Sequence, residues 1–344
     1  MPFDSSVDRS GMRQNLLDWP LQVRRSLRQG RRYGENTPSP PPRVLLWVGM
    51  GGSAIGGDLC ASLAASHAPF PLVVHRGGPL PAWVGPEDRL LLVSFSGGTA
   101  ETLATAEEAV ARKVPCDVLT SGGRLEKWAA GQGLEAWKVP GGRPPRAALG
   151  DLFATAWGAL AARGWCRLGE EEETDALAAL EGITKACSVE PGEDSHPLAG
   201  LLTGLHTRLP MVYGTGRLGA AAHRWATQIN ENAKRPAHWG VLPEMNHNEV
   251  VAYIEGSEWA RRGSLLLLVD PDSPDDVQTR ARVTLEIARD AGWWTWRTSP
   301  AAATPLGRLL ETVALGDWLS FWMALEAGVD PTPIAPIDRL KAAL

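Results

Sequence analysis

The amino-acid sequence predicts an α/β protein with two doubly wound, parallel-sheet domains, each a three-layer α/β/α sandwich. Two observations lead to this prediction. Apolar runs of strand length alternate with segments of helical periodicity, which is typical of right-handed βαβ crossovers. In addition, a strand followed by a glycine-containing loop and a helix occurs twice, at residues 44–66 and 210–230. With 344 residues, the chain is long enough for two domains of ordinary size.

The first half begins with a helical segment at 1–36, which ends at the proline-rich run 37–43. The unbroken apolar run 44–48 predicts a strand that is buried on both faces, as a parallel sheet requires. The other elements of this half are expected at 54–66 (helix), 72–75 (strand), 89–93 (strand), 101–112 (helix), 116–120 (strand) and 136–139 (strand).

The second half repeats this pattern after a helical connector, in which the acidic run 170–173 is expected in an exposed turn. Its elements are expected at 210–213 (strand), 220–230 (helix), 264–269 (strand), 276–291 (helix), 293–298 (strand) and 306–326 (helix). The predicted organisation is an N-terminal helical extension (1–40), a first α/β domain (41–152), a helical connector (153–196), a second α/β domain (197–330) and a C-terminal tail (331–344).

Composition argues against several classes of protein. The formal net charge is −5, whereas nucleic-acid binding usually needs a strongly basic face; the basic stretch 24–32 is expected to be a solvated helix face. No apolar run approaches the ~18–20 residues of a membrane span. The N-terminus lacks the apolar stretch of a signal peptide, so a cytoplasmic location is expected. Cysteines and histidines are scattered without CxxC, HxH or HExxH spacing, so no metal site is expected.

The loop 94–99 (SFSGGT) indicates an anion site, because it places three hydroxyls and two glycines directly before a helix. Hydroxyls and backbone N–H groups at the positive end of a helix dipole bind anions. The corresponding loop of the second half carries carboxylates, including Asp270 and Asp272, which repel a phosphate. We therefore expect the ligand in the first half, with Ser53 as a second contact. The alternative is an ordinary helix N-cap, which needs only one Ser or Thr.

Dinucleotide binding is a further possibility from the glycine loops. Residues 49–54 fit GxGxxA and residues 214–219 fit GxGxxG. The acidic residue expected at the end of the next strand is absent, since that strand ends in His75 and Arg76. An arginine at this position favours NADP, which leaves a NADP-dependent oxidoreductase as an alternative.

Several motifs occur in fixed order along the chain: GMGGSAIGGD (49–58), SFSGGTAET (94–102), PRAALG (145–150), INENAK (229–234), LPEMNHNEVV (242–251) and the tail DPTPIAPIDRLKAAL. Together they resemble the bifunctional phosphoglucose/phosphomannose isomerases, which belong to the sugar isomerase (SIS) domain superfamily. The resemblance implies two SIS domains, a homodimer, and interconversion of glucose 6-phosphate and mannose 6-phosphate with fructose 6-phosphate through a cis-enediol, without metal or cofactor.

The resemblance also assigns the residues of the site. The substrate-binding loop contains Gly51 and Gly52, and the phosphate ligands are Ser53, Ser94, Ser96 and Thr99. Glu231 is the base that transfers a proton between C2 and C1. His247 opens the sugar ring together with Lys341, and it reaches the site from the other subunit of the dimer. Arg146 stabilises the enediolate, with Arg143 as the alternative, and Thr332 leaves room for rotation about C2–C3.

Other interpretations remain open at this point. Glu231 alone would be a surface carboxylate, His247 a structural histidine, and Lys341 a solvated lysine; Glu244 and Glu249 are expected to be structural or surface residues. The chain departs from the family at Gly98, where relatives commonly have Asn, and at Phe95, where a Tyr is frequent. The alternative function is a non-catalytic SIS protein that binds a sugar phosphate through the same loop.

Overall fold

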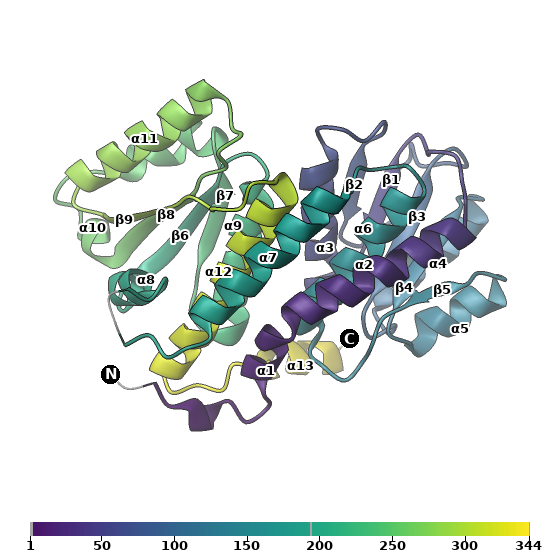
Figure 1. The fold of residues 1–344 in the computed structure, drawn as a ribbon, viewed down its shortest axis with the longest axis horizontal. Coiled ribbons are helices and arrows are strands. Elements are labelled where there is room, and N and C mark those ends of the chain that lie inside the picture. The colour runs from purple at the N-terminus through teal and green to yellow at the C-terminus, as the bar shows by residue number, and fades with distance from the viewer. Residues whose placement is uncertain (1–2, 193–194, 344) are drawn as a thin grey trace. The chain divides into compact units, whose positions relative to one another are not determined.

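The computed structural model describes residues 3–192 and 195–343. The chain divides into two compact units, an N-terminal unit of residues 18–177 and a C-terminal unit of residues 1–17 and 178–344. Each unit contains one parallel sheet flanked by helices (Figure 1), so the predicted fold class is confirmed. Residues 1–2, 193–194 and 344, which fall in the expected extension, connector and tail, lie outside the described residues.

The sheet of the N-terminal unit has the strand order β2-β1-β3-β4-β5. Its strands are β1 (Leu45–Val48), β2 (Leu72–His75), β3 (Arg89–Ser94), β4 (Cys116–Thr120) and β5 (Ala136–Lys138). Its helices are α2 (Trp19–Asn36), α3 (Gly52–Ala64), α4 (Ala100–Ala111), α5 (Gly123–Gly131) and α6 (Leu149–Ala162). The order reverses between β1 and β3, and ligands of open parallel sheets bind at such a reversal, beyond the carboxyl ends of the strands.

The two faces of this sheet are covered by different helices, as the alternation of side chains along a strand requires. Leu46 and Leu92 belong to a buried cluster with Ala106 of α4 and Leu125 of α5. Trp47 points to the other face, where a Cβ at Gly57 of α3 would lie 2.5 Å from its ring. The bulky Trp47 therefore fits only because α3 has a glycine opposite it.

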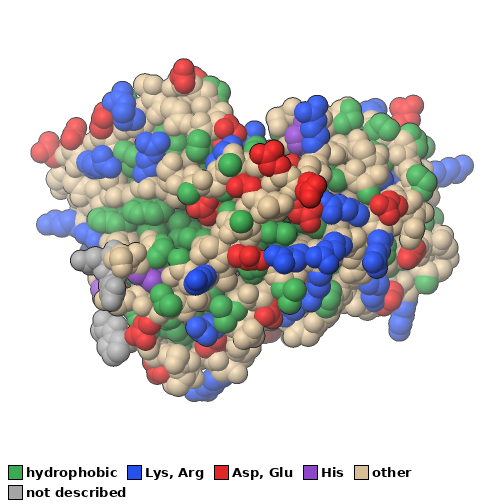
Figure 2. Space-filling view, in the orientation of Figure 1, with side chains coloured by type: hydrophobic (Ala, Val, Ile, Leu, Met, Phe, Trp, Pro, Cys, Tyr) green, Lys and Arg blue, Asp and Glu red, His purple; other side chains and the backbone are tan. Residues whose placement is uncertain are grey.

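Helices α2 and α6 pack closely within the N-terminal unit (Figure 1). A Cβ at Gly30 would lie 2.1 Å from the Thr155 carbonyl oxygen, so the two backbones approach as only glycine allows. Arg25 forms a bidentate pair with the buried carboxylate of Asp151, at 2.8 and 2.9 Å. The basic stretch is thus partly paired, and the remaining positive side chains lie over α2 in Figure 2.

The C-terminal unit repeats the topology of the first four strands, with the order β7-β6-β8-β9. Its strands are β6 (Leu209–Gly214), β7 (His238–Val241), β8 (Gly263–Leu268) and β9 (Trp294–Thr298). Its helices include α8 (Ala199–Leu205), α9 (Leu218–Asn232), α10 (Glu258–Arg262), α11 (Asp275–Asp290), α12 (Pro305–Glu326) and α13 (Ala335–Ala342). The expected internal duplication is confirmed, although the short strand β7 was not predicted.

Two expectations for the helical segments were wrong. The segment 1–36 is not one helix, because a 3₁₀ turn (Ser5–Val7), α1 (Met12–Leu17) and α2 are separate. Gly11 is left-handed between the first two, with φ of 69°, and Pro20 stands at the start of α2, where proline is tolerated. The acidic run 170–173 is not a turn but the first turn of α7 (Glu170–Cys187), where carboxylates favour the helix dipole.

Within the part of the chain that the structure describes, no helix is both long and apolar enough to cross a membrane. The expected cytoplasmic location stays a prediction.

Helix α9 is fixed to α12 by a buried ion pair. Arg224 Nε and Nη2 donate to the two carboxylate oxygens of Asp317, each at 2.9 Å. We expect Arg224→Met to lower the free energy of unfolding by about 3–5 kcal/mol, because Asp317 loses its bidentate partner in the interior. Urea denaturation measures the change.

The matched control is Arg282→Met, which removes an exposed pair with Glu286 on α11. It should change the free energy of unfolding by less than about 1 kcal/mol. Equal effects of the two substitutions would contradict the importance of the buried pair.

Candidate active site

The loops after β1 and β3 are joined at the strand reversal of the N-terminal sheet. The buried Ser53, in the first turn of α3, accepts a hydrogen bond through Oγ from the Phe95 N–H, at 3.2 Å. The Ser53 carbonyl in turn accepts a hydrogen bond from Trp47 Nε1, at 2.8 Å. Ser53 therefore connects the two loops, and its carbonyl is hydrogen-bonded to Trp47 of strand β1.

The hydroxyl groups of the β3 loop form hydrogen bonds within the loop and not to the helix that follows. Ser94 Oγ and Thr99 Oγ1 lie 2.8 Å apart, and the Gly98 N–H donates to Ser96 Oγ at 3.2 Å. Thr99 is the N-cap residue of α4, yet its side chain makes no capping hydrogen bond. The alternative of an ordinary side-chain cap is therefore wrong, and the first N–H groups of α4 lack such an acceptor.

Glycines let the loops and a neighbouring arginine approach closely. Gly97 has φ of 63°, and a Cβ there would lie 1.7 Å from the Gly122 carbonyl oxygen. A Cβ at Gly52 would lie 3.1 Å from the backbone N and Cα of Arg146. Arg146 is buried in the 3₁₀ turn Pro145–Ala148, whereas Arg143 is half-buried in the preceding loop. Of the two arginines, Arg146 thus belongs to the segment packed against the β1 loop.

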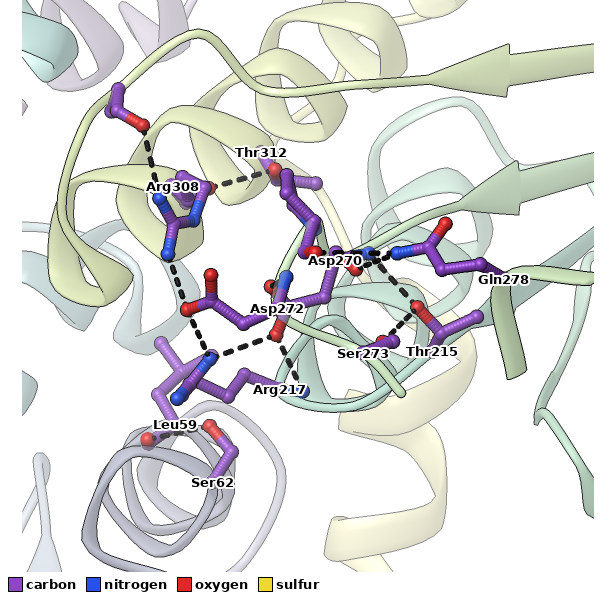
Figure 3. Close-up of polar contacts among 12 residues, drawn as sticks. Leu59, Ser62, Thr215, Arg217, Asp270, Asp272, Ser273, Gln278, Arg308 and Thr312 are labelled. Atoms are coloured by element: carbon purple, nitrogen blue, oxygen red, sulfur yellow. Dashed lines mark hydrogen bonds and ion pairs between the residues drawn. The ribbon is translucent and has the colours of Figure 1, made fainter. Parts of the chain in front are cut away.

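The corresponding loops of the C-terminal unit carry a closed ion cluster (Figure 3). Arg217 Nη1 lies 3.1 Å from both Asp270 Oδ2 and Asp272 Oδ2, and Arg308 Nη2 also bonds to Asp272. The backbone N–H of Arg217, directly before α9, donates to Asp270 at 3.3 Å. A carboxylate of the chain itself thus lies at the helix N-terminus where a bound anion would otherwise lie.

The backbones of the two pairs of loops are alike. Gly51 and Gly216 both have positive φ, at 49° and 50°, and lie directly before α3 and two residues before α9. The Gly97 N–H bonds to the Ser94 carbonyl at 3.0 Å, and the Ser273 N–H bonds to the Asp270 carbonyl at 3.0 Å. By this correspondence, Asp270 and Asp272 stand where the N-terminal unit has Ser94 and Ser96. Of the two pairs of loops, only the N-terminal pair therefore has serine hydroxyls in place of these two carboxylates.

Glu231 lies in the last turn of α9 and is half-buried. Both neighbouring asparagines make hydrogen bonds: Asn232 Nδ2 donates to Ser320 Oγ of α12 at 3.0 Å, and Asn230 Oδ1 accepts from the Ala237 N–H at 3.0 Å. The left-handed Lys234 donates from Nζ to the carbonyls of Glu231 and Pro331. These bonds fix the backbone on both sides of Glu231 and connect it to the start of the tail.

His247 ends the 3₁₀ turn Glu244–His247 and is exposed. Its neighbours are again bonded: Asn246 Nδ2 donates to Thr284 Oγ1 of α11 at 2.7 Å, and Asn248 Oδ1 accepts from the Glu249 N–H at 2.6 Å. The His247 side chain forms no hydrogen bond or ion pair with any residue in the described ranges. Both motifs thus use asparagines to hold a segment whose central side chain reaches solvent.

Glu249, expected to be structural or at the surface, is half-buried and bonded to the sheet. The Tyr213 hydroxyl of β6 donates to Glu249 Oε2, and His238 Nε2 of β7 lies 3.2 Å from the same oxygen. Burial, and then the hydrogen bond to Glu249, raises the pKa of Tyr213, so the phenol keeps its proton and donates it. In the sequence, only the position of Glu249 beside the motif Asn246-His247-Asn248 (NHN) could have indicated this contact.

Lys341 lies on α13, all of whose described residues are exposed. No hydrogen bond or ion pair joins the Lys341 side chain to the described part of the chain. Across residues 3–192 and 195–343, no group of three or more His, Cys, Asp or Glu side chains is arranged to hold a metal ion. The structure thus brings together Ser53, Ser94, Ser96, Thr99, Gly52 and Arg146 in the N-terminal unit, and places Glu231, His247 and Lys341 on separate elements of the C-terminal unit.

Comparisons with known proteins agree with the fold. The family described as the bacterial phospho-glucose isomerase C-terminal SIS domain matches residues 194–344. A hypothetical protein of Thermus thermophilus has a similar crystal structure, with a TM-score of 0.74 at 19% identity, covering 97% of this chain and 90% of that one. The C-terminal part of the chain thus resembles the SIS domain of bacterial phospho-glucose isomerases, and the chain shares the fold of the Thermus protein.

Two relatives define the family. A bifunctional phosphoglucose/phosphomannose isomerase of Aquifex aeolicus is 32% identical over 306 residues, covering 88% of this chain and 91% of that protein. One of Caldicellulosiruptor bescii is 28% identical over 331 residues, covering 96% and 98%. The chain belongs to the bifunctional phosphoglucose/phosphomannose isomerase family, which confirms both the resemblance and the prediction of an isomerase.

The asymmetry between the two pairs of loops can be tested by anion binding. Ser94→Ala should weaken binding of inorganic phosphate roughly tenfold or more, because a hydrogen bond to a charged group contributes about 1.5–3 kcal/mol. Ser273→Ala, which removes a buried hydroxyl from the corresponding turn of the C-terminal unit, should leave the affinity unchanged. Isothermal titration calorimetry measures both affinities, and equal losses would contradict the assignment.

Proposed function

We propose that the protein interconverts glucose 6-phosphate and mannose 6-phosphate with fructose 6-phosphate. The observation that carries this proposal is the β3 loop, which offers three hydroxyls and an N-terminus of α4 without a side-chain cap in a chain of this family. Isomerisation oxidises one of C1 and C2 and reduces the other within one molecule. The proposed reaction therefore needs no external oxidant or reductant, and the family resemblance implies that it needs no metal.

The substrate phosphate binds at the N-terminus of α4. Ser53, Ser94, Ser96 and Thr99 supply hydroxyl donors, and the first backbone N–H groups of α4 add the positive end of the helix dipole. Gly51 and Gly52 let the backbone of the β1 loop approach the ligand. The phosphate is chemically inert in this reaction, so its binding serves to hold C1 and C2 in one position.

Glu231 acts as the base. In the aldose-to-ketose direction it removes the proton from C2 of the open-chain sugar, which gives a cis-enediol, and returns it to C1. General acid–base catalysis of this kind contributes typically 10²–10⁴-fold to a rate. The bonds of Asn230, Asn232 and Lys234 support this role, because they hold the helix end that carries the carboxylate.

His247 and Lys341 open the ring by moving a proton between O1 and O5. Arg146 stabilises the negative charge that develops on the enediolate oxygen, and its place beside Gly52 favours it over Arg143. Both epimers are substrates, because glucose and mannose differ only at C2 and that carbon becomes planar in the enediol. Thr332, at the start of the tail, leaves room for rotation about C2–C3.

The protein acts as a homodimer in which His247 is contributed to the active site of the other subunit. Two features of the segment support this arrangement. His247 is exposed without a partner among the described residues of its own chain, and the apolar side chains that follow it are exposed too, Val251 at 77% and Ile254 at 62%. Exposed apolar side chains beside a functional residue are typical of an interface.

Glu231→Gln should lower turnover of fructose 6-phosphate roughly 10²–10⁴-fold, because the amide cannot accept the proton from carbon. Formation of glucose 6-phosphate is followed through its dehydrogenase, and formation of mannose 6-phosphate by direct chromatography. Glu286→Gln, which alters an exposed glutamate on α11, should keep full activity. Full activity of Glu231→Gln would disprove the mechanism; binding of the sugar phosphate by the wild-type protein without turnover would indicate the non-catalytic alternative.

The contribution of His247 across the dimer can be tested by subunit mixing. Glu231→Gln and His247→Ala homodimers should each have little activity. If the two residues of one active site come from different subunits, random mixing after partial denaturation restores about a quarter of wild-type activity, since half of the dimers are mixed and have one intact site. No recovery from a mixture that forms mixed dimers would show that both residues act within one chain.

A further inference from the structure

We propose that Glu249 is a positioning residue that holds the segment of His247 against the sheet through its hydrogen bond to Tyr213. This inference deepens the proposed function and rests on the role of His247 given there. It concerns a residue that the family resemblance did not single out.

His247 lies between two short 3₁₀ turns, Glu244–His247 and Glu249–Ala252, which are not part of the sheet. Its own side chain has no bonding partner in the described ranges. Its position is therefore decided by the anchors of the neighbouring residues. On the N-terminal side the anchors are the buried Met245 and the hydrogen bond from Asn246 to Thr284 of α11.

On the C-terminal side the anchor is Glu249. Its Oε2 accepts from the Tyr213 hydroxyl and lies 3.2 Å from His238 Nε2, so one carboxylate oxygen joins the segment to both β6 and β7. Gly240 of β7 makes room for this contact. A Cβ at Gly240 would lie 2.7 Å from the Tyr213 ring and 3.7 Å from Glu249 Oε1.

The Tyr213 end of this contact is rigid. Tyr213 is fully buried in β6 and packs in a cluster with Leu265 and Leu267 of β8. Hydrogen bonds to an ionised acceptor are roughly twice as strong as neutral ones. The Tyr213–Glu249 bond therefore connects the C-terminal side of the segment to the buried core of the unit.

The consequence for the reaction is geometric. A group that transfers a proton must lie within hydrogen-bond reach of it, and a displacement of about 1 Å costs as much as 10²-fold in rate. Without Glu249, the two asparagines remain but the bond to the sheet is lost. The imidazole of His247 can then still transfer a proton, but it is no longer held in the position that the reaction requires.

The test is a double-mutant cycle of Glu249→Ala and His247→Ala, with kcat/KM for fructose 6-phosphate as the readout. Glu249→Ala alone should lower kcat/KM about 10–100-fold. In the His247→Ala background it should lower kcat/KM less than about twofold, because two residues that act as one are not additive. The matched control Glu244→Ala, on the same segment and bonded only to Asn248 among the contacts described, should keep wild-type activity. Equal factors in both backgrounds would overturn the proposal.

A second measurement does not depend on activity. In Tyr213→Phe, which removes only the hydroxyl, backbone amides of residues 244–252 should exchange with solvent at least about tenfold faster than in the wild type. Unchanged exchange in this variant would overturn the proposal, even if Glu249→Ala did not fold. If the wild type did not turn over the sugar phosphates, the proposed function would fail while the exchange experiment still decided whether Glu249 anchors the segment.

Discussion

The parallel register of β1 and β3 is the constraint on which the candidate phosphate site depends. Val48 pairs with Leu92, so both strands end at the same edge of the sheet and their loops must meet there. The hydrogen bond from the Phe95 N–H to Ser53 Oγ then joins the loops. The strand order reverses at this point, and open parallel sheets bind their ligands at such a reversal, beyond the carboxyl ends of the strands.

The internal duplication shows that the same topology does not by itself produce the same site. Both units have the same order of four strands and the same left-handed glycine before the first helix. In the C-terminal unit, however, Asp270 and Asp272 stand in place of serines and are neutralised by Arg217 and Arg308. One topology thus carries a candidate anion site with serine hydroxyls in one copy and an internal ion cluster with carboxylates in the other.

The NEN motif (residues 230–232) and the NHN motif (residues 246–248) hold their central residue in the same way. In each, the asparagines form hydrogen bonds within the C-terminal unit, and the central residue is left at the surface. Asparagine suits this use because its amide both donates and accepts, so one side chain can satisfy a backbone group or a hydroxyl. The motifs therefore specify the backbone around Glu231 and His247 as much as they specify the two side chains.

The sequence by itself determined the fold class, the duplication and the strands β1, β3 and β8, because long apolar runs between glycine loops have few alternatives. It also placed the hydroxyl loop before α4. It did not determine β7, which has four residues including Gly240 and forms through pairing with β6. Tertiary structure alone decided that Thr99 does not cap α4 and that Glu249 bonds to Tyr213, 36 residues away. Such contacts depend on which strands become neighbours, and local sequence periodicity carries no information about that.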